Sequence, residues 1–130
     1  SSVMDLSKFM IIHMNGGKYE DIQILNETYI DEMHTIQEPG NKENFYHFGL
    51  GWLKMTKSIR VVNGLYLSCF KNTLYEGQDG GFYGVSTVIR KKIDENTAVI
   101  IFINMSKNAR GCYNSLYTIM DTLFKKAKDL

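Results

Sequence analysis

Residues 77–87, reading Gly-Gln-Asp-Gly-Gly-Phe-Tyr-Gly-Val-Ser-Thr, are the part of the chain whose residue types and spacing best suit chemistry. Four glycines fall within eight residues, and a β-branched run follows directly. Glycine permits positive φ and close approach of the backbone but costs conformational entropy, so this density indicates a steric or functional requirement. We expect a glycine-rich loop that brings bare backbone NH groups up to a substrate oxygen. The plainer alternative is a bulged connection before an edge strand.

The residues that follow predict a β-hairpin that positions this loop. Residues 85–93 and 97–105 are rich in β-branched and apolar side chains, and the polar turn 94–96 separates them. The second segment is almost entirely apolar from Ala98 to Ile103, which predicts a central strand buried on both faces. Asn63-Gly64, between two short apolar runs, predicts a further hairpin.

Three helices are predicted to pack on this sheet. Ser2 and Asp5 form a capping box at the start of the first, and Gly16-Gly17 suits its left-handed stop. Asn26 caps the second. The third covers about residues 111–127 and has lysines at its C-terminal end. Its apolar side chains at core spacing are Leu116, Ile119, Met120, Leu123, Phe124 and Ala127. The predicted fold class is α+β, an antiparallel sheet of about three to five strands with N-terminal and C-terminal helices packed on it.

Five segments of the chain form an ordered set, namely residues 1–10 with 15–17, 24–33, 48–52, 77–87 and 98–104. In this order and spacing they resemble the C-terminal half of the penicillin-binding-protein-like serine hydrolases. That superfamily holds class C β-lactamases, D-alanyl-D-alanine carboxypeptidases and related esterases. The resemblance implies that residues 1–130 are one C-terminal fragment of a larger β-lactamase-like α/β sandwich. In the family, N-terminal strands complete the sheet and a separate helical region closes the cleft.

Two catalytic motifs of that family are missing from this chain. No serine is followed three positions later by lysine, and no tyrosine has asparagine two residues on. In the family, Ser-x-x-Lys supplies the nucleophile and a base, and Tyr-x-Asn supplies a second base. The chain also begins with Ser1 inside an expected helix cap, so we expect an expressed or processed fragment that is inactive alone.

The glycine-rich stretch corresponds, by resemblance, to the family's third motif, Lys-Thr-Gly or His-x-Gly, on the strand that edges the active site. Aligning Gly84 with the glycine four places after the motif's own glycine puts Gln78 at the lysine or histidine position, Asp79 in the middle and Gly80 third. Gly81 would then donate its backbone NH to the oxyanion hole. Such donors stabilise the negative charge that develops on a tetrahedral intermediate.

The motif departs from the family pattern at its first two positions. Gln78 is a neutral amide where family members carry a residue that can be positively charged, and Asp79 adds a negative charge that would repel an anionic substrate. This disfavours true β-lactamase activity and favours a weak hydrolase, an esterase or an inactive relative. Tyr83, within the loop, and Ser86 are the expected substrate-binding residues. Trp52 could line a cleft, but an aromatic side chain in such surroundings is more often part of the core.

Composition excludes several other function classes. The 130 residues carry a formal net charge of +1, which favours neither nucleic acid nor an anionic membrane as a partner. Two cysteines, Cys69 and Cys112, make neither a metal motif nor a disulfide framework. His13, His34 and His47 share no metal-ligand spacing, and His13 is better interpreted as a helix-face residue than as a catalytic base. The sequence therefore indicates no metal and no cofactor.

Three functional hypotheses follow. The first is the C-terminal part of a serine hydrolase that acts on amide or ester bonds (cell-wall D-Ala peptides, β-lactams or esters) through an acyl-serine intermediate. The second is a non-catalytic cell-wall peptide-binding or regulatory module with the same fold. The third, a phosphate or nucleotide binder, lacks the Gly-Lys-Ser/Thr ending and the strand–loop–helix order that such sites need. The resemblance also implies a bacterial extracytoplasmic or membrane-associated parent, and an unpaired sheet edge in the fragment predicts a homodimer.

Overall fold

The computed structural model describes residues 1–38, 46–55, 75–105, 112–127 and 129, and these form a mixed α+β fold. Five strands make an antiparallel sheet in the order β3-β4-β5-β6-β7, and β1 and β2 form a separate two-stranded sheet. The α+β prediction is confirmed. The elements are α1 (Val3–Met14), β1 (Lys18–Tyr19), β2 (Ile22–Gln23), α2 (Glu27–His34), β3 (Tyr46–Phe48), β4 (Leu53–Met55), β5 (Tyr75–Phe82), β6 (Val85–Lys92), β7 (Ala98–Ile103) and α3 (Cys112–Ala127).

The ends of the first two helices follow from their capping residues. The Ser2 hydroxyl accepts from the Asp5 NH at 3.1 Å, and the Asp5 carboxylate accepts from the Ser2 backbone, which completes the predicted capping box. The Asn26 side chain accepts from the Thr28 NH at 2.9 Å and starts α2. After α1, Gly17 has φ 89° and packs so closely that a Cβ would lie 2.0 Å from the Leu25 carbonyl oxygen.

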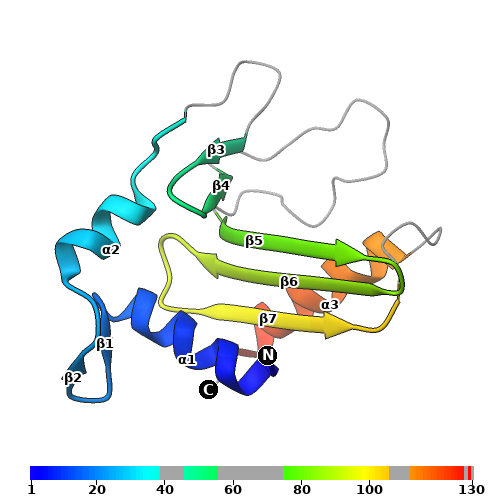
Figure 1. Ribbon diagram of the computed structural model, residues 1–130. Coiled ribbons are helices and arrows are strands. Elements are labelled where there is room, and N and C mark those ends of the chain that lie inside the picture. Colours follow the sequence, from blue (N-terminus) through cyan, green and yellow to red (C-terminus); the bar gives the residue numbers. More distant parts are fainter. Residues whose placement is uncertain (39–45, 56–74, 106–111, 128, 130) are drawn as a thin grey trace.

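The hydrophobic core lies between α3 and one face of the large sheet, and Figure 1 shows α3 running behind the strands. Leu116, Met120 and Phe124 recur every four residues and are almost completely buried, so they form the stripe of α3 that faces the sheet. Ile119 and Leu123, which the apolar spacing also placed on the core face, are 46% and 41% exposed. The sheet side of the core consists of Tyr75, Val88, Val99 and Ile101, with Ile103 packed against it.

The strand Ala98–Ile103 is not central, contrary to the prediction from its apolar sequence. β7 is the last strand in the sheet order, and no strand of the described part pairs with its outer side. Val99 and Ile101 face the α3 core, whereas Phe102 is 36% exposed. Helix α1 contacts β7 and runs beside it in Figure 1. An apolar run indicates that other elements cover both faces of a strand, but it does not indicate which strands pair along its two edges.

Two further sequence predictions remain predictions. The Asn63-Gly64 hairpin lies outside the described residues, and homodimerisation through a free sheet edge is a matter of association between copies. Within the described part of the chain, no helix is both long and apolar enough to cross a membrane.

Candidate functional site

The glycine-rich stretch is a strand rather than the expected loop. β5 continues through Phe82, a two-residue turn of Tyr83 and Gly84 follows, and β6 starts at Val85. Gly84 has φ 76°, which a side chain would disfavour at this position of the turn. Glycine has a low β-propensity, so the sequence predicted a loop. In the structure, pairing with β6 makes these residues part of a strand.

Close packing between β5 and β6 explains two of the glycines. A Cβ on Gly77 would lie 1.9 Å from the Ile89 carbonyl oxygen and 2.9 Å from the Arg90 Cα. A Cβ on Gly80 would lie 2.4 Å from the Thr87 hydroxyl oxygen. Real Cβ atoms do not approach backbone this closely, so position 77 requires glycine for steric reasons, whereas at position 80 the Thr87 side chain would have to move.

Among the described strands, β5 has no partner on its outer side where the candidate motif lies, and this stretch is called the open edge. β4 pairs with β5 only at Tyr75, Glu76 and Gly77. From Gln78 to Phe82, β5 is paired with β6 on its inner side and with no strand of the described part on its outer side. On this edge Gln78 and Gly81 are exposed, and no described strand occupies their outward peptide groups.

The register determines which of these peptide groups face the open side. The turn joins Phe82 to Val85, and a β-turn of this kind closes on a hydrogen-bonded pair. Bonded and non-bonded pairs alternate along an antiparallel ladder, so Gly81 opposite Ser86 is a non-bonded pair and its NH faces away from β6. Asp79, two residues earlier, agrees with this parity, because its NH donates to the Gln78 side-chain oxygen at 3.2 Å.

Asp79 does not present an unbalanced negative charge, which corrects the expectation that it would repel anions. The Arg90 Nη2 lies 2.7 Å from its Oδ1. Arg90 is 1% exposed and also donates through Nη1 to the Ile89 carbonyl oxygen at 3.0 Å. A buried guanidinium requires an anionic partner, so this ion pair fixes the middle residue of the motif to β6.

The two expected substrate-binding residues lie in different environments. Tyr83 is 90% exposed at the tip of the hairpin, and its ring meets that of Phe82 edge-on at 5.3 Å. Ser86 is completely buried, and its hydroxyl donates to the Met105 carbonyl oxygen at 2.8 Å. The Ser86 hydroxyl therefore has an internal partner, and substrate contact by either residue stays a prediction.

A second polar cluster, which sequence reasoning missed, lies beside the motif and joins α1, α2 and β5. The His13 Nδ1 lies 3.0 Å from the His34 Nε2, and the His34 Nδ1 donates to the Glu76 carboxylate. All three side chains are at least nine-tenths buried. Their separations in sequence, 21 and 42 residues, carry no motif spacing, which is why the histidines showed no pattern.

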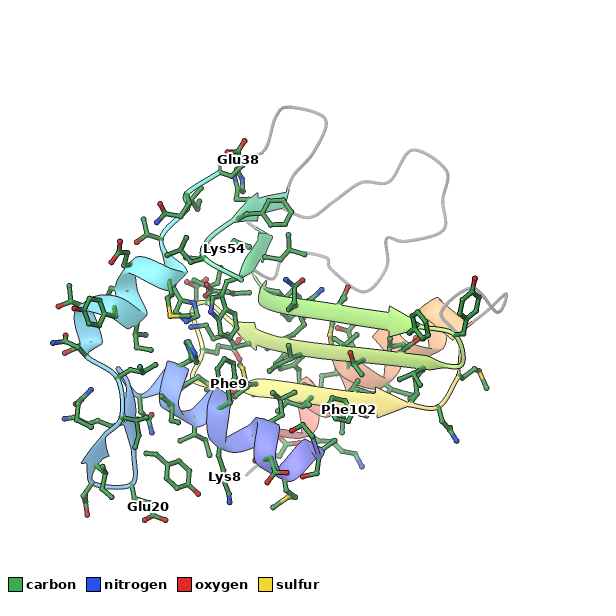
Figure 2. All side chains as sticks on the ribbon, viewed as in Figure 1. Lys8, Phe9, Glu20, Glu38, Lys54 and Phe102 are labelled. Carbon is green, nitrogen blue, oxygen red and sulfur yellow. The ribbon has the colours of Figure 1, made fainter. Side chains whose placement is uncertain are left out.

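Trp52 forms one wall of this cluster and is part of the core rather than of an open cleft. It is 4% exposed, and its ring lies 4.8 Å from that of His13 and 4.4 Å from that of His34. Phe9 stacks on its ring at 6.1 Å. Figure 2 shows Phe9 on the side of α1 that faces the strands, and Lys54 on β4 near the end of the sheet where α2 lies.

The charges around Glu76 shift two pKa values. Burial lowers the pKa of His13 from 6.5 to about 4, and the charges of His34 and Lys91 add to this effect. Burial alone would raise the pKa of Glu76, but the His34 hydrogen bond and the ammonium groups of Lys91 and Lys54 outweigh it, so that pKa is lowered. Lys91 and Lys54 lie 3.4 and 3.6 Å from the carboxylate oxygens. At neutral pH the cluster therefore contains an ionised Glu76 and an uncharged His13.

No group of three or more His, Cys, Asp or Glu side chains in the described ranges could hold a metal ion. The His13–His34–Glu76 cluster instead satisfies its own hydrogen bonds, apart from the His13 Nε2, which has no hydrogen-bond partner there. The two nearby ammonium groups would also oppose a bound cation.

The described fold is similar to that of a solved structure. The described fold matches part of a D-stereospecific amidohydrolase from a Streptomyces species, with a TM-score of 0.53 and 22% sequence identity. The match covers 80% of this chain and 25% of that one. The likeness shows a shared fold. At this identity the likeness concerns the fold alone, and the family to which the chain belongs is a matter for proposal. No family model and no curated protein sequence matches the chain.

The chain spans a quarter of the length of this amidohydrolase. Activity, substrates and partners of a complete protein are therefore matters for proposal.

The buried imidazole of His13 predicts a specific loss of stability in acid. Its pKa is lower in the folded chain than the usual 6.5, so the unfolded chain binds more protons between pH 6.5 and about 4, and stability falls as pH is lowered through this window. We expect unfolding by denaturant to show a loss of about 2 kcal/mol between pH 6.5 and 4.5 that His13→Phe removes. An equal slope in the wild type and in this variant would show that His13 is not the group responsible.

The steric surroundings of the glycines predict that two alanine substitutions lower the free energy of unfolding by different amounts. Gly77→Ala forces a Cβ into the backbone of β6, so we expect a loss of about 3 kcal/mol or more. Gly84→Ala meets no atom within 4 Å and suffers only from its positive φ, so about 1–2 kcal/mol is expected. Denaturant unfolding of both variants measures the difference. Equal losses would contradict the close approach of β5 and β6.

Proposed function

We propose that this chain is the C-terminal part of a penicillin-binding-protein-like serine hydrolase that acts on amide or ester bonds through an acyl-serine intermediate. Cell-wall D-Ala peptides, β-lactams and simple esters are the candidate substrates. The observation that carries the proposal is the open edge of β5, where the register directs the NH of Gly81 away from β6. The fold shared with part of an amidohydrolase supports it.

The proposed chemistry assigns a limited role to this chain. A serine hydroxyl, supplied by the remainder of the parent protein, attacks the substrate carbonyl, and its proton passes to the neighbouring lysine. The carbonyl oxygen becomes an oxyanion, which accepts a hydrogen bond from the Gly81 NH. A second NH, from the nucleophile itself, completes the oxyanion hole. Because β5 is held by β6 along its length, the Gly81 donor is oriented before substrate binds.

The charge of the motif narrows the substrate class. Gln78 is neutral, and the Asp79 carboxylate is paired with Arg90. The motif itself therefore offers hydrogen bonds and no unbalanced charge at the position where relatives place lysine or histidine. This favours uncharged esters or amides over substrates that need a cation at that position, and it disfavours β-lactamase activity.

A non-catalytic role is the second candidate. An open strand edge can bind an extended peptide by strand addition, with main-chain hydrogen bonds supplying affinity. A parent gene without an upstream Ser-x-x-Lys, together with calorimetric binding of muropeptides, would select this alternative.

The hydrolase proposal is tested by acylation of the complete parent protein. If the parent contains Ser-x-x-Lys and Tyr-x-Asn upstream, it should be labelled by an activated ester or a fluorescent penicillin. Gly81→Pro removes the outward NH while leaving the ladder to β6 intact, and acylation should slow by about 100-fold or more. Gly81→Ala is the matched control, because it adds a methyl group and keeps the NH.

Two outcomes would contradict the proposal. One is a parent with both motifs that no such reagent labels. The other is equal acylation of the Gly81→Pro and Gly81→Ala proteins.

A further inference from the structure

The Glu76 carboxylate is the point at which four other elements meet β5. His34 from α2 donates to it, Lys54 from β4 and Lys91 from β6 lie 3.6 and 3.4 Å from it, and His13 from α1 reaches it through His34. Glu76 is 2% exposed, so none of these interactions is strongly screened by water. A buried carboxylate with this many donors holds their elements in one arrangement.

Glu76 also occupies a particular place on β5. It lies two residues before Gln78, so the two side chains share a face of the sheet. The pairing of β5 with β4 ends one residue later, at Gly77. Glu76 is therefore at the end of the doubly paired part of β5, and the open edge that carries Gly81 starts just beyond it.

The hydrogen bonds of the cluster account for its protons. The His34 Nδ1 donates its proton to the ionised Glu76, and the His34 Nε2 lies 3.0 Å from the His13 Nδ1. A further proton on the uncharged His13 brings positive charge beside His34 and Lys91. On the His13 Nε2 it would also meet no acceptor among the described residues. The arrangement is thus stable only while His13 is uncharged.

We infer that the chain Glu76–His34–His13 is a positioning network that sets the open edge of β5 relative to α1 and α2, and that protonation in mild acid loosens it. Glu76, His34 and His13 are at least nine-tenths buried. They act through the backbone of β5, so the inference concerns the same strand edge as the proposed function. Only the catalytic role of that edge rests on the proposed function.

The groups that face His13 determine how readily it takes up a proton. They are His34 on α2, Glu76 on β5 and Lys91 on β6, with the apolar rings of Phe9 and Trp52 filling the remaining sides. Lys91 also lies 5.9 Å from the centre of the Trp52 ring. Burial, together with the electrostatic effects of His34 and Lys91, opposes a charged His13, whereas the Glu76 carboxylate favours it.

The test is a pH titration of the isotope-labelled 130-residue chain by nuclear magnetic resonance. As pH falls from 7 to 4, the amide signals of Gly80 and Gly81 should shift together with the imidazole signals of His13, with one common midpoint. In His13→Phe, which keeps an aromatic ring against Phe9 and Trp52, the amide shifts with that midpoint should be lost.

Two variants separate positioning from a general loss of structure. Glu76→Gln should move the Gly80 and Gly81 amide signals at neutral pH, whereas Glu20→Gln, an exposed carboxylate, should leave them unchanged. If Glu76→Gln does not fold, the wild-type titration and His13→Phe still decide the matter.

Gly80 and Gly81 signals that stay constant while His13 titrates would overturn the inference, as would an unchanged response in His13→Phe. None of these readouts needs a nucleophile. Failure of the acylation test and failure of this one are therefore distinguishable.

Discussion

The antiparallel pairing of β5 with β6 is the constraint on which the rest of the structure depends. All eight residues of β5 have partners on β6, but only three have partners on β4. Gly77 allows the two strands to approach more closely than a side chain at that position would permit. Because a two-residue turn sets the register, it also determines which peptide groups face outward.

The buried charges on the two faces of this strand pair have different partners. On the face covered by α3, Arg90 extends from β6 to Asp79 and neutralises the middle of the motif. On the opposite face, Glu76 binds the side chains that tie α1, α2 and β4 to β5. Removing one member of either group would leave a buried charge without its partner, which costs far more than the net value of the pair. The sequence retains these charges where an apolar core would be simpler, which fits a strand whose position must be defined.

Local signals in the sequence predicted much of the fold. The Ser2 and Asn26 caps, the β6–β7 hairpin and α3 all appear in the structure, because short-range hydrogen bonds and apolar periodicity determine them. The edge position of β7 and the meeting of His13, His34 and Glu76 were not predicted, because both depend on contacts between residues far apart in sequence. The sequence showed that the glycines are unusual, but the structure explains them by close contacts with β6 rather than by a loop. The resemblance to a hydrolase family rested on five ordered segments, and the structural likeness supports it at the level of fold.

The central claim is that β5 presents its outward NH groups, including that of Gly81, along an open edge. Amide hydrogen exchange of the folded chain, resolved for each residue, tests this most directly. The register predicts alternation, with slow exchange at Gly80 and Phe82, which face β6, and faster exchange at Gly81 between them. Protection of Gly81 equal to that of Gly80 and Phe82 would contradict the account, because the proposed donor would then already be bonded within the fold.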